Sequence, residues 1–95
     1  GPHVFSGHEL PRSKPFPDVY LAAAAALGAA PRRCLVIEDT PTGIQAGVAA
    51  GATVWAYCPR PDEADALIAA GAHALFDSMA GLPALWQAGR APRSA

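Results

Sequence analysis

One stretch of the sequence, Cys34 to Gly51, does most to limit the folds open to this chain. It begins with four apolar residues, Cys34 to Ile37, which have the length and β-branched content of a buried parallel strand. A helix is then indicated by Thr40, whose side chain suits an N-cap, and by Pro41, which suits the first helical position. Gly51 is well placed to end this helix in a left-handed conformation. The stretch therefore predicts a buried strand, a turn and a helix.

Two adjacent carboxylates, Glu38 and Asp39, lie between this strand and this helix. In open α/β sheets, ligands bind outside the carboxyl ends of the strands, where helix N-termini offer N–H groups to anions. Two carboxylates there would repel a phosphate group unless a cation bridged them, so Mg²⁺ is the expected third component. A structural alternative also fits, in which Asp39 only helps to cap the helix and Glu38 is solvated.

The rest of the chain repeats the alternation of short apolar runs with helical segments. Strands are expected at Val4-Phe5, Thr53 to Tyr57 and His73 to Phe76, and further helices at Pro17 to Gly28, at Asp62 to Gly71 with Asp62 as the cap, and after Ser78. This order predicts a doubly wound, Rossmann-like α/β fold with a parallel sheet. We expect residues 1–86 to form the folded part and Gln87 to Ala95 to be a disordered tail.

Composition limits the classes of partner. Apolar residues make up 52% of the 95 residues and charged residues only 16%, which suggests that some surfaces are covered by something outside this chain. A net charge of −1 and a pI near 6.3 argue against nucleic acid or an acidic membrane as a partner. No run has the length of a transmembrane helix and no signal peptide opens the chain, so we expect a cytoplasmic protein. Cys34 and Cys58 are expected to be buried free thiols.

A loop lysine becomes informative when it is considered with the acid pair. Alone, Lys14 would be interpreted as a solvated surface charge. However, Lys14 belongs to the segment 14–18 (KPFPD), which is followed by an expected helix. The segment 36–40 (VIEDT) comes next, ahead of Gly43 and of the segment 49–51 (AAG). This arrangement resembles the haloacid dehalogenase superfamily. More narrowly, the pattern is similar to the branch of small-molecule phosphatases and β-phosphoglucomutase-like enzymes. The resemblance covers residues 4 to 86.

The resemblance implies a mechanism and a set of site residues. Enzymes of this family attack a phosphoryl group with an aspartate and form an aspartyl-phosphate, which water or a second substrate hydroxyl then discharges. Lys14 would contact the nucleophile and the phosphoryl oxygens. Asp39 would bind Mg²⁺, and Glu38 would be a second ligand or an outer-shell acceptor. Ser13 and Thr40 would have supporting roles at the phosphate site and at the turn. The expected substrate is a small phosphorylated metabolite, with a sugar phosphate favoured.

The family's nucleophile is missing from this chain. It lies in a D-x-D motif, and none of the five aspartates here, at positions 18, 39, 62, 65 and 77, forms one. The strands that carry the family's first two motifs lie between those matching Val4-Phe5 and Cys34 to Ile37. We therefore expect a gap in the sheet, with unpaired backbone on two strands. The chain is interpreted as the C-terminal part of a longer enzyme that also has N-terminal core and cap segments, and alone it is expected to be inactive.

Two other interpretations remain open at this stage. In one, the 95 residues are the whole product, a non-catalytic fragment that folds only by dimerising or by pairing with another chain. In the other, which is weaker, the chain is a receiver-like or nucleotide-binding α/β module, although no glycine-rich phosphate loop follows any expected strand.

Overall fold

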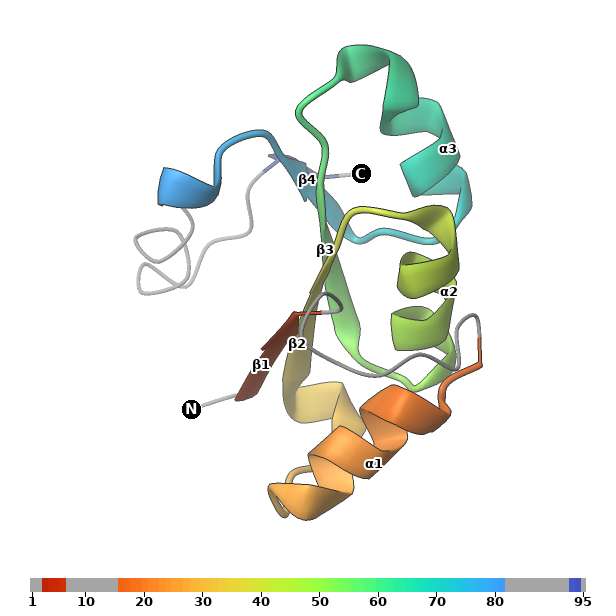
Figure 1. Cartoon of the computed structure of the whole chain (residues 1–95), viewed down its shortest axis with the longest axis vertical. Helices are drawn as coiled ribbons and strands as arrows, with labels where there is room; N and C mark the ends of the chain where they lie inside the picture. The colour runs from red at the N-terminus through yellow and green to blue at the C-terminus, as the bar shows by residue number, and fades with distance from the viewer. Residues whose placement is uncertain (1–2, 7–15, 82–92, 95) are drawn as a thin grey trace.

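The computed structural model describes residues 3–6, 16–81 and 93–94, and these form one five-stranded sheet flanked by helices (Figure 1). The strands, in chain order and in sheet order, are β1 (His3–Ser6), β2 (Cys34–Glu38), β3 (Thr53–Tyr57), β4 (Ala74–Phe76) and β5 (Arg93–Ser94). The first four are parallel, and β5 is antiparallel to β4. The predicted α/β fold with a parallel sheet is confirmed.

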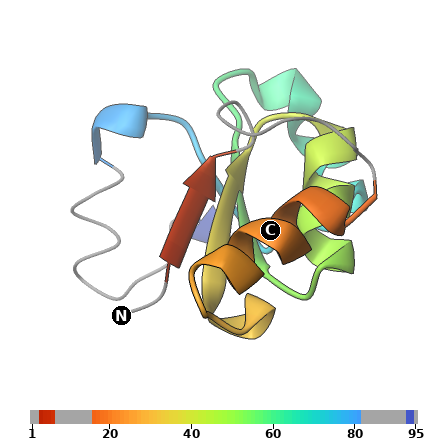
Figure 2. The same ribbon diagram turned by 60° about the horizontal axis from the view of Figure 1, so that its bottom comes forward.

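Three α-helices lie on the same face of the sheet, as Figures 1 and 2 show. They are α1 (Asp18–Ala26), α2 (Pro41–Ala49) and α3 (Ala64–Ala69), and short 3₁₀ turns form at η2 (Pro31–Arg33), η3 (Pro61–Glu63) and η4 (Met79–Gly81). No helix in the described segments is long and apolar enough to cross a membrane. The chain leaves α2 through Gly51 at φ +88°, the left-handed conformation predicted for the end of this helix.

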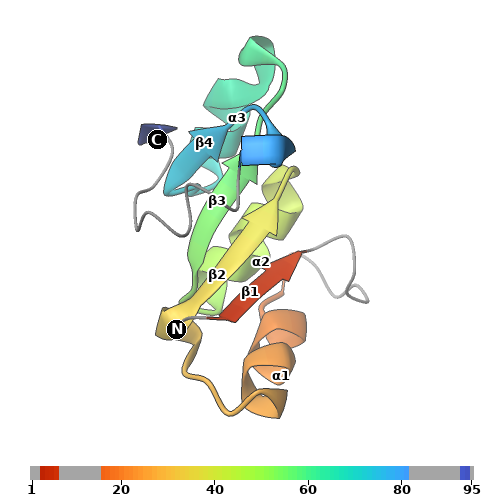
Figure 3. The ribbon, with the colours of Figure 1, turned by 90° about the vertical axis from the view of Figure 1, so that its left-hand side faces the viewer.

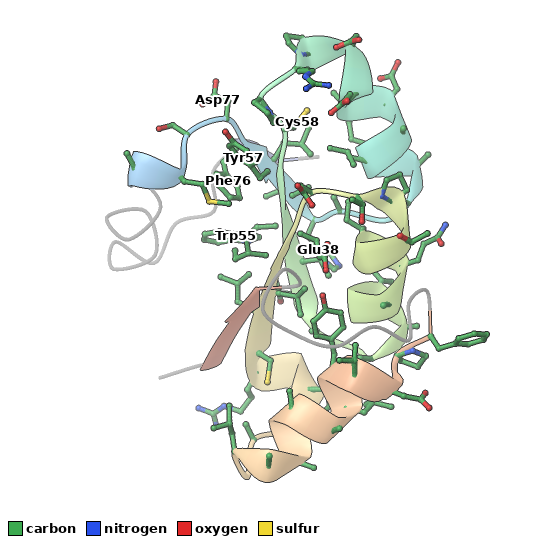
Figure 4. The ribbon with its side chains drawn as sticks, in the orientation of Figure 1. Glu38, Trp55, Tyr57, Cys58, Phe76 and Asp77 are labelled. Carbon is green, nitrogen blue, oxygen red and sulfur yellow. The ribbon has the colours of Figure 1, made fainter. Side chains whose placement is uncertain are left out.

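Alternate residues along β2 face opposite sides of the sheet and join two separate apolar clusters. Cys34 and Val36 pack on the helix side with Tyr20 and Ile44. The cluster on the other face consists of Leu35, Ile37, Trp55, Ala74 and Phe76. Figure 4 shows the same division, with Glu38 on the side of the helices and Trp55, Tyr57 and Phe76 on the opposite side. Glu38 continues the alternation of β2, so its carboxylate enters the space under the helices.

Small residues let α2 lie close to the sheet. Ala46 and Gly47 are buried, and a Cβ atom on Gly47 would lie 2.8 Å from Cγ2 of Val54 on β3. Ile44 and Val48 are four residues apart on this helix, a spacing that predicts that both are buried. Ile44 is buried, but the side chain of Val48 is 38% exposed. The close approach matters for function because it fixes the N-terminus of α2 beside the carboxyl end of β2.

The expected gap in the sheet is wrong for this chain. β1 pairs directly with β2 in parallel register, with His3 opposite Cys34 and Ser6 opposite Ile37. Figure 3 shows these two strands side by side. Without a partner, one edge of β2 would present a row of unsatisfied N–H and C=O groups, and β1 supplies that partner within the chain.

The C-terminal end of the sheet also differs from expectation. Arg93–Ser94, within the segment expected to be a disordered tail, pairs with β4 as β5, so β4 is not the edge strand. Backbone pairing along an edge needs no apolar side chains, so a polar segment can provide it. Asp62 lies in the 3₁₀ turn η3, and α3 begins after Glu63 without a side-chain cap. The predicted apolar face after Ser78 lies outside the described residues.

Candidate active site

The carboxyl ends of the parallel strands meet at one edge of the sheet, and polar residues follow three of them. Glu38 ends β2 and Asp39 comes directly after it, Cys58 follows β3, and Asp77 follows β4 (Figure 4). Asp39 is half-buried and its Oδ1 atom is shielded from solvent. This edge is where ligands bind in open α/β sheets, so it is the candidate active site.

The N-terminus of α2 begins at this edge, immediately after the acid pair. Thr40 is its N-cap, because Oγ1 of Thr40 accepts a hydrogen bond of 3.1 Å from the backbone N–H of Gly43. Pro41 occupies the first helical position, and the first turn contains no acidic residue. The positive end of the helix dipole therefore lies next to Glu38 and Asp39 and favours negative charge there.

Glu38 is an almost completely buried carboxylate, with 2% of its surface exposed. The hydroxyl of Tyr20, on α1, donates a hydrogen bond to Oε2 of Glu38. The carboxylate also lies against the backbone of Gly43, because a Cβ atom at that position would be only 2.0 Å from Oε1 of Glu38. Glu38 is thus enclosed between α1, the first turn of α2 and the sheet, and the alternative in which it is solvated is wrong.

Tyr20 is held in its protonated form by these surroundings. Burial raises the pKa of the Tyr20 hydroxyl far above its ordinary value near 10, and the hydrogen bond to Glu38 and its negative charge raise the pKa further. A protonated phenol is a hydrogen-bond donor, which is what a buried carboxylate requires. Tyr20 therefore remains a hydrogen-bond donor over the neutral pH range.

The described residues offer part of the donor set that a metal site would need. Mg²⁺ in phosphoryl-transfer enzymes is commonly held by one or two carboxylates together with water and phosphate oxygens. Asp39 and Glu38 fit such a donor set, and among the described ranges no three His, Cys, Asp or Glu side chains gather into a fuller one. The structure brings Glu38, Asp39 and Thr40 together at one strand end. Lys14 and Ser13, predicted to act on the phosphoryl group, lie outside the described residues.

The sequence spacing predicts that Tyr20 shares one apolar helix face with Ala23, Ala24 and Leu27, and this pattern does not connect Tyr20 with Glu38. A signal was present, because Glu38 directly extends an apolar run and a buried carboxylate requires a donor from elsewhere in the chain. Gly43 was a second signal. A glycine inside a helix lowers the stability of the helix, so its presence suggests that another group must approach the backbone closely at this position. Tyr20 and Gly43 together hold the buried Glu38 side chain of the predicted acid pair in place.

Other polar side chains near the sheet have structural contacts. The backbone N–H of Val54 donates to Nδ1 of His73 at 2.9 Å, and the N–H of His73 donates to the carbonyl of Val54 at 2.9 Å. The thiol of Cys58 donates to the carbonyl of Arg60 at 3.1 Å. Cys34 and Cys58 are buried free thiols, as predicted, and burial raises the pKa of Cys34. These contacts tie strands and turns together and leave the strand end of β2 as the candidate site.

Comparison with known proteins confirms the family resemblance that was inferred from the sequence motifs. The sequence profile of the family described as haloacid dehalogenase-like hydrolase matches residues 2–51. Hexitol phosphatase A of Escherichia coli is 42% identical over an alignment of 73 positions, and the match covers 70% of this chain and 34% of that protein. The 6-phosphogluconate phosphatase of Escherichia coli is 32% identical over 85 residues, 90% of this chain and 38% of that protein.

A solved structure is similar to this chain in both fold and sequence. A HAD family hydrolase from Deinococcus radiodurans, crystallised with bound phosphate and sodium, superimposes with a TM-score of 0.71 and is 48% identical. The match covers 87% of this chain and 38% of that protein. The chain therefore spans between about a third and two-fifths of the length of these relatives.

Proposed function

Because the chain belongs to the haloacid dehalogenase-like hydrolases, we propose that it is part of a Mg²⁺-dependent phosphatase acting on small phosphorylated sugars or sugar alcohols. The observation that carries this proposal is the position of Asp39. It follows strand β2 directly and precedes Thr40, the N-cap of α2. A carboxylate and a helix N-terminus at one strand end suit the joint binding of a cation and a phosphate group.

The choice of substrate class rests on the relatives. Two of them are named as phosphatases of a hexitol phosphate and of 6-phosphogluconate, and a third binds phosphate in its crystal structure. These names favour hydrolysis of a phosphate ester over transfer between two positions of a sugar, so a phosphomutase remains the second candidate. We propose a cytoplasmic enzyme whose partner is the small phosphorylated substrate and neither nucleic acid nor a membrane.

In the proposed mechanism, the chain's own residues bind and orient the phosphoryl group. Asp39 offers a carboxylate oxygen as a metal ligand, and Glu38, which is enclosed and held by Tyr20, is an outer-shell acceptor. As the family resemblance implies, Lys14 contacts the phosphoryl oxygens in this mechanism and lowers the repulsion between them and an attacking carboxylate. Bound Mg²⁺ supplies further neutralisation of phosphate charge.

The nucleophile of the proposed reaction comes from outside this chain, and its strand is proposed to take the place beside β2 that β1 has here. An aspartate in the N-terminal core segment of the same protein attacks phosphorus, the bond between phosphorus and the sugar oxygen breaks, and the sugar oxygen takes up a proton from an acidic group of that segment or from water. Water then attacks the aspartyl-phosphate, which releases phosphate and restores the carboxylate. A cap segment, also outside this chain, selects the substrate. The 95 residues alone are expected to give no turnover, because none of their aspartates lies in a D-x-D motif.

The proposal is tested in the complete protein that contains this sequence. Phosphate release from hexitol phosphates and from 6-phosphogluconate is measured with and without Mg²⁺. Asp39→Asn is expected to lower turnover by at least about 100-fold, because it removes a charged metal ligand while keeping the shape of the side chain. Lys14→Ala is expected to lower turnover strongly as well.

His73→Ala is the matched control. It removes an imidazole that accepts a hydrogen bond from the backbone of β3 and lies away from the acid pair. This variant should therefore leave turnover nearly unchanged. If the three variants lose turnover equally, the site has been misassigned. If the wild-type protein hydrolyses no sugar phosphate at any Mg²⁺ concentration, the proposed function is wrong.

A further inference from the structure

A buried contact joins two parts of the chain that are distant in sequence. Tyr20 lies in the first turn of α1 and is 1% exposed, and its hydroxyl donates to Oε2 of Glu38 at the end of β2, 18 residues away. Burying a carboxylate is costly unless donors satisfy it. A contact of this kind fixes the orientation of the carboxylate more firmly than apolar packing would.

The first turn of α2 closes over the same carboxylate. Gly43 leaves room for it, since even a methyl group there would overlap Oε1 and Cδ of Glu38, at 2.0 and 2.1 Å. The N–H of Gly43 is bonded to Thr40, so the residue that contacts Glu38 is also the one that Thr40 caps. The Glu38 carboxylate is therefore held between Tyr20 on one side and the capped turn on the other.

Asp39 lies between the two ends of this arrangement. It is the residue that joins Glu38 to Thr40, so its backbone is fixed on one side by the Tyr20–Glu38 contact and on the other by the cap of α2. Tyr20 also belongs to the helix that begins shortly after Lys14 in the sequence. A change at Tyr20 would alter the acid pair without removing either acid.

We propose that Tyr20 is a positioning residue of the magnesium site, whose hydroxyl orients Glu38 and through it the strand end that carries Asp39. This inference rests on the proposed function, and it adds a residue that lies on α1 and not on the strand end itself. Outer-shell groups of this kind typically change metal affinity by about 10- to 100-fold. Tyr20→Phe, which removes only the hydroxyl, should therefore weaken Mg²⁺ binding by about tenfold.

The test is a calorimetric titration of the complete protein with Mg²⁺ alone, in the absence of substrate. Two controls accompany Tyr20→Phe. Tyr57→Phe removes the hydroxyl of a half-buried tyrosine that packs against Phe76 on the opposite face of the sheet. Leu67→Ala opens a cavity in α3, so it lowers the melting temperature without a contact to Glu38. Both controls are expected to change the Mg²⁺ dissociation constant by less than about twofold, since neither touches the acid pair.

The outcomes separate this inference from the proposed function. Weaker Mg²⁺ binding in Tyr20→Phe alone supports the positioning role. Binding that matches Tyr57→Phe, or that weakens equally in Leu67→Ala, overturns it. A wild-type protein that binds Mg²⁺ but hydrolyses no sugar phosphate refutes the proposed function, and the same titrations still decide the role of Tyr20. A wild-type protein that binds no Mg²⁺ refutes both.

Discussion

Glu38 and Asp39 are neighbours in the chain, yet they have different surroundings at the end of β2. Glu38 is buried and held by Tyr20 and by the first turn of α2. Asp39 is half-buried, follows the last residue of the strand and lies at the edge where ligands bind. An enclosed carboxylate can hold secondary-structure elements in place, whereas a carboxylate at the open edge can contact a ligand. We infer from this comparison that the two adjacent acids divide these two tasks.

Gly43→Ala should lower the stability clearly, because the new methyl group would overlap the Glu38 carboxylate. Overpacking of this kind costs about 1–3 kcal/mol, although alanine's better helix propensity offsets part of the loss. The free energy of unfolding is measured by urea denaturation. Gln45→Ala, at an exposed position of the same helix, is the control and should change it by less than about 0.5 kcal/mol.

Measuring Gly43→Ala in a protein that already carries Glu38→Ala tests the cause of this loss. If the overlap with Glu38 is the cause, Gly43→Ala should cost less when Glu38→Ala is already present, because the obstructing carboxylate has gone. The difference between the two backgrounds is the coupling energy between the two positions. An equal cost in both backgrounds would show that Glu38 is not what requires a glycine here.

Thr40→Ala should have a smaller effect, since it removes one capping hydrogen bond at the other side of Asp39. Loss of a threonine N-cap typically lowers the free energy of unfolding by about 1 kcal/mol. Thr40→Ser keeps the hydroxyl and should retain most of the stability in the same urea titration. Equal losses in Thr40→Ala and Thr40→Ser would mean that the methyl group, and not the cap, is responsible.

Local sequence signals predicted the centre of the molecule well. The apolar run at Cys34 to Ile37, the cap at Thr40 and the left-handed glycine at Gly51 each depend on neighbours in sequence, and all three are present in the structure. The parallel order of the strands also follows from their alternation with helices. At Leu27 the periodic pattern fails, because α1 ends at Ala26 and the side chain is 51% exposed.

Long-range contacts were the part that the sequence did not reveal. The pairing of β1 with β2 joins residues about 31 positions apart, and no local pattern specifies which strands are neighbours. The pairing of Arg93 with Leu75 uses backbone groups that every residue has. The contact between Tyr20 and Glu38 is of the same type, since each residue alone is compatible with several partners. The acid pair was therefore predictable as a pair, but its division into an enclosed and an open acid was not.

The most direct measurement compares Asp39→Asn with Glu38→Ala in the complete protein, by Mg²⁺ titration and by urea denaturation. Asp39→Asn should weaken Mg²⁺ binding by at least about tenfold, as expected for the loss of a charged ligand, and leave the free energy of unfolding nearly unchanged. Glu38→Ala should lower the free energy of unfolding by about 2 kcal/mol or more, because it leaves a cavity and the Tyr20 hydroxyl without its acceptor. Wild-type Mg²⁺ affinity in Asp39→Asn, or equal stability losses in both variants, would contradict this division of tasks.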